Sequence, residues 1–216
     1  MKTIVCLGDS NTFGVNPDGG RFPRQIRWTG RLQTLLGEEY YVVEEGLNGR
    51  TTVWEDPMQP CRCGMEALPY ILKTHNPIDV MLIMLGTNDC KAHFHASARS
   101  IGRGLDSLCQ RVLASDDEGY PAPGLFLVAP IYIGEGIGAN ALSSYDETAP
   151  AKSRELAFYY QKVAEAYHAG FLDAAAVASP GSDLLHMDAA SHEALAQALA
   201  GELRKWFDGK GSEAGR

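Results

Sequence analysis

The chain has 216 residues, of which 45% are hydrophobic and 21% are charged, and this suits one soluble globular domain with a substantial core. Its 27 acidic side chains outnumber the 19 lysines and arginines, giving a net charge of −8, and the scattered cations argue against nucleic acid or an anionic membrane as a partner. The first apolar run, at 3–7, is too short for a signal peptide and no stretch approaches a membrane span, so we expect a cytoplasmic protein.

Strands are expected where β-branched and aromatic residues cluster. The first, at 3–7, leads into Gly8-Asp9-Ser10, where glycine permits a sharp turn and the polar side chains can bond nearby amides. Four more strands are expected at 40–45, 78–85, 125–129 and 171–173. The second and third also end in glycine, asparagine and threonine, so the same strand-and-polar-turn unit occurs three times. The long apolar run of the third strand indicates burial on both faces of a sheet.

Helices are expected where apolar residues recur at helical spacing, at 25–36, 64–75, 97–114, 152–168 and 189–207. Pro69 is expected to interrupt or kink the second of these helices. The segment 131–150 has no clear period and suits either a flap over a pocket or a plain connection. We expect a single domain at 1–208 and a glycine-rich, frayed tail at 209–216.

Five strands that alternate with helices predict a three-layer α/β/α fold built on a five-stranded parallel sheet. The flavodoxin-like strand order 2-1-3-4-5 places the first and third strands at the switch point. In that order Ser10 and Asn88 emerge beside one crevice at the carboxyl edge of the sheet, with Gly49 on its other rim.

The residues at these strand ends fit acyl transfer by a serine, which needs a base within hydrogen-bond reach, a carboxylate to orient the base, and donors for the oxyanion. Ser10 is the candidate nucleophile, His186 the base and Asp183 the acid. An Asp three residues before a His can reach Nδ1 and leave Nε2 for the serine. Asp173, at the end of the fifth strand, is the alternative acid, although the spacing to His186 favours Asp183.

Three hydrogen-bond donors are candidates for the oxyanion hole: the backbone N–H of Ser10, the backbone N–H of Gly49 and the side-chain amide of Asn88. Three aromatic residues are candidates for lining a small acyl pocket, with plain core packing as the equal alternative: Phe13, Trp28 and Trp54.

The other histidines suggest no second base. His93 and His95 follow Asn88 closely, but no acid is spaced to orient either ring. The remaining three lie in or at the ends of amphipathic helices and are expected to face solvent or to cap those helices: His75, His168 and His192.

The five cysteines suggest free thiols in a reducing compartment. Cys6 and Cys109 lie in apolar periodic segments, as small core residues do. Cys61-Arg62-Cys63 is compatible with a metal or redox site, but a zinc site needs a second ligand pair. The nearest candidates form no recognised pattern: Cys90, His93 and His95.

Together these blocks resemble the SGNH (GDSL-type) hydrolases, because four motifs of that family occur in order across essentially the whole chain: Gly8-Asp9-Ser10, the Gly49 loop, Gly86-Thr87-Asn88-Asp89 and Asp183-x-x-His186. Other segments are similar to the bacterial arylesterase and acyltransferase branch: Arg27-Trp28-Thr29-Gly30, Glu44-Glu45-Gly46-Leu47 with Arg50-Thr51-Thr52, and Met84-Leu85 before the third motif. The resemblance implies hydrolysis of short acyl groups, often acetyl, from aryl or carbohydrate esters. It also implies an acyl-enzyme resolved by water or an alcohol, no metal or cofactor, and frequently a homo-oligomer.

The chain departs from the family pattern at three places. Asn11 replaces the leucine of the GDSL motif, and Gly49 stands where the branch commonly has alanine; we expect both changes to leave the chemistry intact. The segment 131–150 does not look like the proline-rich insertion of the branch, which leaves substrate choice and assembly open.

Two alternative functions stay open. A thioesterase or lysophospholipase would share every catalytic residue. A non-catalytic flavodoxin-like binding module would need a phosphate or flavin cradle, and the turn after the first strand lacks the glycine-rich helix entry that such a cradle uses.

Overall fold

The computed structural model describes residues 1–115 and 119–213 and contains one five-stranded sheet in its described part. All neighbouring strands are parallel, and their order is β2-β1-β3-β4-β5, which confirms the predicted fold and strand order. The strands are β1 (Lys2–Gly8), β2 (Tyr40–Gly46), β3 (Val80–Met84), β4 (Gly124–Ala129) and β5 (Gly170–Asp173).

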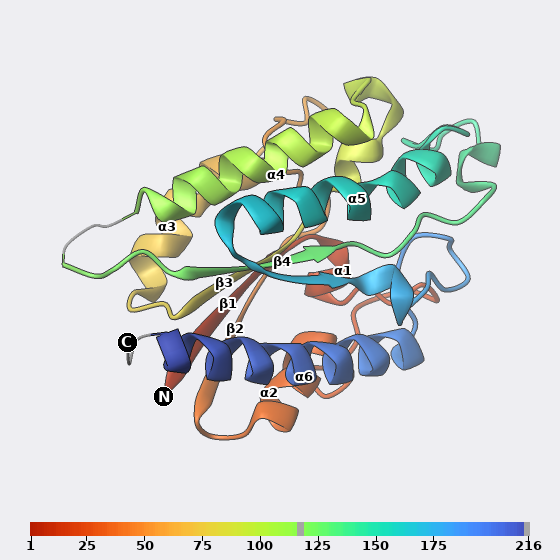
Figure 1. Ribbon diagram of the computed structural model, residues 1–216. Coiled ribbons are helices and arrows are strands. Elements are labelled where there is room, and N and C mark those ends of the chain that lie inside the picture. The colour runs from red at the N-terminus through yellow and green to blue at the C-terminus, as the bar shows by residue number, and fades with distance from the viewer. Residues whose placement is uncertain (116–118, 214–216) are drawn as a thin grey trace.

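Helices cover both faces of the sheet, as Figure 1 shows. One face carries α3 (Gly64–His75), α4 (Ala98–Leu113) and α5 (Ala149–Tyr167), and the other carries α2 (Trp28–Leu36) and α6 (Ala189–Glu213). Short helical segments follow several strands: α1 (Ser10–Phe13), η1 (Asn88–Cys90), η2 (Ala92–Phe94), η3 (Ile137–Ala139) and η4 (Ala174–Ala176).

The central strands divide their side chains between two cores. Val5 and Leu7 of β1 pack in the core beneath α3, α4 and α5, whereas Ile4 and Cys6 pack in the core beneath α2 and α6. Every residue of β3 is buried, with alternate residues in the two cores. Because successive strand residues point to opposite faces, burial on both sides requires the apolar run seen in the sequence.

Several element boundaries differ from those expected. The second helix begins at Trp28 rather than at 25, and α5 begins at Ala149, earlier than 152. The final helix continues to Glu213 instead of ending at 207, so most of the expected tail is helical; 214–216 lie outside the described residues. Pro69 lies inside α3, where a proline costs a backbone hydrogen bond and does not end the helix here.

The chain connects these elements so that the polar turns after β1, β2 and β3 lie at one edge of the sheet, while the N-terminus and the last turns of α6 lie toward the other end of the molecule (Figure 1). Within the described ranges, no helix is both long enough and apolar enough to cross a bilayer.

Candidate active site

An open cleft of about 460 Å³ lies at the carboxyl edge of the sheet. Segments that are distant in sequence line it, namely the turns after β1, β2 and β3, the connection before α5 and the loop before α6. They contribute Ser10, Gly49, Asn88, Tyr145 and His186 among other residues. Parallel α/β sheets place ligands at this edge.

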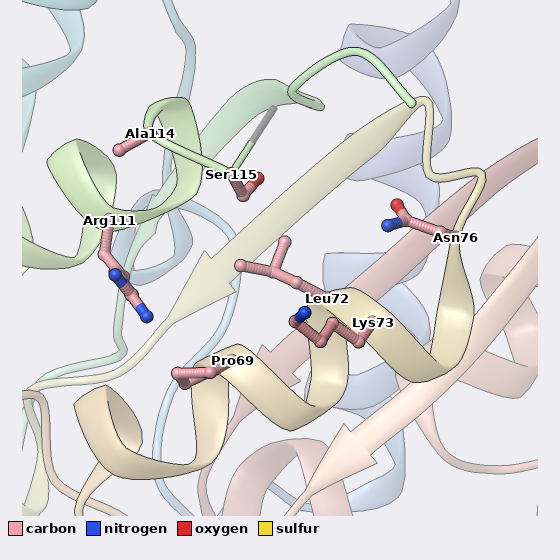
Figure 2. Close-up of a pocket in the computed structure, with 7 residues that line it drawn as sticks. All are labelled: Pro69, Leu72, Lys73, Asn76, Arg111, Ala114 and Ser115. Atoms are coloured by element: carbon pink, nitrogen blue, oxygen red, sulfur yellow. The ribbon is translucent and has the colours of Figure 1, made fainter. Parts of the chain in front are cut away.

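A second hollow, shown in Figure 2, lies between the C-terminal halves of α3 and α4. Its described lining comprises Pro69, Leu72, Lys73, Asn76, Arg111, Ala114 and Ser115. That lining holds no histidine, cysteine or carboxylate, so the chemistry concentrates in the first cleft.

Ser10, His186 and Asp183 form one chain of hydrogen bonds in the cleft. His186 Nε2 lies 2.9 Å from Ser10 Oγ, and His186 Nδ1 lies 2.5 Å from Asp183 Oδ2. A carboxylate facing Nδ1 favours the proton on that nitrogen, which leaves Nε2 as an acceptor for the serine hydroxyl. The structure thus brings together three residues from opposite ends of the chain.

The local backbone explains how Asp183 holds the ring. Its Oδ1 accepts hydrogen bonds from the backbone N–H groups of Leu185 at 3.0 Å and His186 at 2.8 Å, while Oδ2 faces the imidazole. Although burial opposes ionisation, these N–H groups and the ring of His186 lower the pKa of Asp183. The carboxylate is therefore charged and fixed beside Nδ1.

Asn11 joins the serine turn to the histidine loop, a contact that sequence reasoning missed. Its Oδ1 accepts from the backbone N–H of Met187 at 2.9 Å, and its Nδ2 donates to the carbonyl of Leu185 at 3.3 Å. These two backbone groups flank His186. The only sequence signal was the replacement of the family's leucine by a polar residue directly after Ser10.

The three residues expected to supply donors for the oxyanion all line the cleft. Ser10 begins α1, so its N–H has no partner inside that helix. Gly49 adopts a φ of 78°, which favours glycine, and a Cβ there would lie 2.5 Å from Gln59 Oε1. Asn88 Nδ2 donates one hydrogen to the carbonyl of Arg50 at 3.1 Å and keeps a second for a ligand.

Buried polar residues brace these turns from behind. Arg50 donates to the carbonyl of Gly8 at 3.1 Å and also to that of Glu45, which ties together the ends of β1 and β2. Asp89 Oδ1 accepts from the N–H of Thr52 at 2.9 Å and from its hydroxyl at 2.5 Å. Burial, countered in part by these Thr52 bonds, raises the pKa of Asp89 to about 6.

The three aromatic candidates for the acyl pocket do not line the described cleft. Trp28 is fully buried in the core under α2 and α6. Trp54 packs on the other core beside Phe94 and faces α4, and the guanidinium of Arg21 covers the ring of Phe13 at 3.8 Å. Trp28 and Trp54 thus take the alternative of core packing, whereas Phe13 packs against Arg21.

Two expectations for the other histidines are wrong. His192 is not solvent-facing, because its side chain is 0% exposed and its Nδ1 accepts from the backbone N–H of Trp28 at 3.2 Å. His93 does have a nearby acid, since its Nε2 lies 3.3 Å from Asp56 Oδ1. Asp56 comes from the segment 47–63 between β2 and α3, which has no period from which this contact could be read.

The remaining candidates take structural positions. His75 contacts Glu45 at 2.7 Å, and His168 caps α5 in the left-handed conformation. His95 is the left-handed residue that ends η2. Asp173, the alternative acid, caps η4 by accepting from the N–H of Ala175 at 3.0 Å, whereas Asp183 is the carboxylate that contacts His186.

All five cysteines have free thiols; Cys61 is exposed and the other four are buried. Cys61 adopts a φ of 64° in the strained left-handed region. Cys63 lies with Glu55 and Glu66 so that one possible ligand atom from each falls within 4.8 Å of the others. Neither Cys90 nor the histidines after Asn88 belong to this group.

The comparisons with known proteins agree with this geometry. The sequence profile of the GDSL-like lipase/acylhydrolase family matches residues 6–194. Among solved structures, the native aryl esterase of M. smegmatis is 39% identical, with a TM-score of 0.90, and the match covers 95% of this chain and 99% of that one. A carbohydrate acetylesterase from Sinorhizobium meliloti is 32% identical with a TM-score of 0.90, covering 95% of this chain and 100% of the other. No curated protein sequence matched the chain.

A lipase/acylhydrolase from Enterococcus faecalis, 20% identical with a TM-score of 0.70, shares the fold over 95% of this chain and 96% of that one. The family profile spans the serine turn and the histidine loop, and the esterase structures match nearly the full length of the chain. The chain therefore belongs to the GDSL-like lipase/acylhydrolase family, the SGNH hydrolases of the sequence resemblance, and is a carboxylic ester hydrolase.

Proposed function

We propose that the protein is a serine esterase that removes short acyl groups, acetyl above all, from aryl or carbohydrate esters through an acyl-enzyme. The observation that carries this proposal is the hydrogen-bonded chain from Ser10 Oγ through His186 to Asp183, at 2.9 and 2.5 Å. A hydroxyl, a base and an orienting acid in this order are the parts that acyl transfer requires.

In the proposed reaction Ser10 Oγ attacks the ester carbonyl while His186 Nε2 takes its proton. Asp183 stabilises the imidazolium, and the ring then gives the proton to the departing alkoxide as the carbon–oxygen bond breaks. Water, activated by the same ring, attacks the acyl-enzyme and releases the acid. When an alcohol takes the place of water, the product is a new ester.

The tetrahedral intermediate would place its oxyanion among the N–H of Ser10, the N–H of Gly49 and the amide of Asn88. Removal of one such donor typically lowers kcat by about 10²–10³-fold. The amide of Asn88 is held from both ends, since Tyr145 donates to its Oδ1 at 3.3 Å and Arg50 accepts from its Nδ2. A donor fixed before the reaction loses little energy in reorganisation.

The preference for short acyl groups rests on the walls around the nucleophile. Ser10 is only 6% exposed, and three aliphatic side chains line the cleft together with the ring of Tyr145: Val15, Ile137 and Leu185. Polar residues make up much of the remaining lining, including Asn48, Ser143 and Ser144. An enclosed nucleophile with aliphatic side chains beside hydroxyl and amide groups suits a small acyl group attached to a polar or aromatic alcohol. The names of the esterase and acetylesterase relatives support this choice.

The test is hydrolysis of p-nitrophenyl esters from acetate to octanoate by the wild type and by Ser10→Ala. We expect the acetate to be the best substrate, the serine variant to lose activity, and Asp183→Asn to lower kcat by about 10³–10⁴-fold through the wrong imidazole tautomer. Trapping with an organophosphonate should label Ser10. Equal activity in Ser10→Ala would refute the nucleophile, and a maximum at octanoate would favour a lipase-like or thioesterase substrate instead.

Acyl transfer is measured in the same system by adding an alcohol to the acetate assay. We expect the acetylated alcohol to appear together with free acetate, and both products to disappear in Ser10→Ala. Absence of the new ester at high alcohol concentration would restrict the proposal to hydrolysis.

A further inference from the structure

The charge of the cleft differs from that of the whole chain. The protein carries a net charge of −8, yet no aspartate or glutamate is among the described residues that line the cleft, whereas Arg62 and Lys91 are. Two acids close to the cleft already have partners, since Asp183 contacts His186 and Asp56 contacts Lys91 at 2.8 Å, and neither lines the cleft. The cleft therefore offers cations without offering carboxylates.

Lys91 is not available to a ligand in the same way as Arg62. Its side chain is 6% exposed, and its ammonium donates to Asp56 Oδ2 at 2.8 Å and to Gln59 Oε1 at 3.2 Å. The positive charge of Lys91 is thus neutralised within the wall, where it fixes the loop that carries Gln59.

Arg62 has no such partner. Within the described part of the chain its guanidinium forms no ion pair and no hydrogen bond, and its Nε is buried without an acceptor. Elsewhere in this acidic chain arginines pair with carboxylates, as Arg27 does with Glu44 at 2.6 Å and Arg154 with Glu135 at 2.8 Å. A buried, unpaired N–H group costs free energy that an incoming acceptor recovers.

The position of Arg62 places it beside the oxyanion loop. Its Cδ lies 3.7 Å from the point that a Cβ on Gly49 would occupy, and its carbonyl accepts from the N–H of Thr51 at 3.1 Å. Burial lowers the pKa of the Arg50 guanidinium, and the nearby positive charge of Arg62 lowers it further. The unpaired guanidinium of Arg62 in the cleft wall favours an anion over a neutral group.

We propose that Arg62 binds an anionic oxygen group of the substrate, so that the preferred ester carries a carboxylate or a similar oxyanion in its acyl half or its alcohol half. This inference rests on the proposed esterase function and narrows its substrate class. A guanidinium matches a carboxylate with two parallel N–H···O bonds, which a neutral amide of the same shape cannot reproduce.

The experiment compares matched esters that differ only in charge. For the alcohol half the pair is 3-acetoxybenzoate and 3-acetoxybenzamide; for the acyl half it is phenyl hydrogen glutarate and its terminal amide, each corrected for uncatalysed hydrolysis. We expect the wild type to prefer the anionic member of one pair by about tenfold in kcat/KM, mainly through KM. Arg62→Gln should abolish that preference, Arg62→Lys should keep part of it, and added salt should reduce it.

Arg99→Gln is the matched control, because Arg99 is an exposed arginine of α4 outside the cleft, and it should keep the wild-type preference. Benzoate should also inhibit the wild type more strongly than benzyl alcohol does, a measurement that needs no variant. Equal rates for charged and neutral members of both pairs would overturn the inference and leave the esterase function intact. Arg62→Gln with an unchanged preference would overturn it as well, whereas no hydrolysis of any ester would refute the esterase function itself.

Discussion

Asn11 and Met187 are 176 positions apart, yet Asn11 Oδ1 accepts a hydrogen bond from the buried N–H of Met187 at 2.9 Å. The same side chain donates to Leu185, so the residue after the proposed nucleophile holds both neighbours of the proposed base. The leucine common in the GDSL motif could make neither bond. In this protein the asparagine therefore sets the distance between the serine turn and the histidine loop.

We expect Asn11→Leu to fold but to lower kcat by about tenfold or more, because His186 is no longer held at 2.9 Å from Ser10. The unpaired N–H of Met187 should also cost about 1–3 kcal/mol of stability. Steady-state kinetics with phenyl acetate and urea unfolding measure the two effects. Asn16→Leu, which removes only a local bond to Asp18, is the control and should leave kcat unchanged. An Asn11→Leu enzyme with normal kcat would show that the histidine loop holds its position without this residue.

Tyr145 is the second residue that acts on the proposed catalytic groups from a distance. It comes from the connection before α5, it is buried, and its hydroxyl donates to Asn88 Oδ1 at 3.3 Å. That bond keeps the oxygen of the amide away from the site where the oxyanion forms and turns the Nδ2 group toward it. Tyr145→Phe should therefore lower kcat by about threefold to tenfold with little change in KM, less than the loss of the donor itself.

A double-mutant cycle separates this positioning effect from a general loss of packing. If Tyr145 acts through Asn88, its substitution should change kcat little once Asn88→Ala is present. Tyr70→Phe, at an exposed tyrosine, serves as the control. Additive losses in the double variant would contradict the positioning role, and so would a Tyr145→Phe variant that changes KM alone.

The fold followed from the sequence because its signals are local and repeated. The apolar run of β3 and the alternation of helical segments are sufficient to indicate a parallel sheet, and the three polar turns all follow strands whose carboxyl ends meet at one edge. The end of α6 was less predictable, since Gly209 and Gly211 weaken the helical pattern without ending the helix at 207.

Within the site, Asp183 and His186 could be identified from the sequence because they are three residues apart. Ser10 could be identified because its turn is the first of the family's motifs in order. Residues such as Asn11, Tyr145 and Asp56 could not, because each acts through a contact between segments with no local pattern. The aromatic residues were misleading for a related reason. A tryptophan near a motif is consistent with a pocket wall or with core packing. Only the structure distinguishes these interpretations, because it packs Trp28 in one core and Trp54 against the other.

Asp89 gives the protein a pH-dependent stability with a definite sign. Burial raises the pKa of Asp89 to about 6, so the folded state keeps this proton over a range in which the unfolded chain, with a pKa near 3.8, has lost it. Stability from this group therefore falls as pH rises from about 4 to about 6, by up to about 3 kcal/mol. Asp89→Asn keeps an acceptor for Thr52 but cannot ionise, so its advantage over the wild type in free energy of unfolding should grow across this interval. A constant difference between the two proteins from pH 4 to pH 7 would contradict the raised pKa.

His192 makes the stability of the fold depend on pH in the opposite direction. Burial lowers the pKa of its ring to about 4, against an ordinary value of 6.5, so the folded state stays neutral at pH values where the unfolded chain takes up a proton. Its contribution to stability is fully present above about pH 6.5 and is lost as pH falls toward 4, by about 3 kcal/mol in total. This loss opposes the gain from Asp89 in the same window, so the wild-type curve alone does not separate them.

His192→Asn separates the two groups, because asparagine can still accept the hydrogen bond from the N–H of Trp28 but has no proton to gain. The variant should be less stable than the wild type at pH 7, where the ring fills the core beside Phe22, and the difference should shrink as the pH falls to 4.5. Urea unfolding at a series of pH values measures it, with His168→Asn at the end of α5 as a control for a histidine that lies outside the core. If the difference between His192→Asn and wild type does not change with pH, the ring takes up its proton over the same pH range in the folded and unfolded states, and the lowered pKa is wrong.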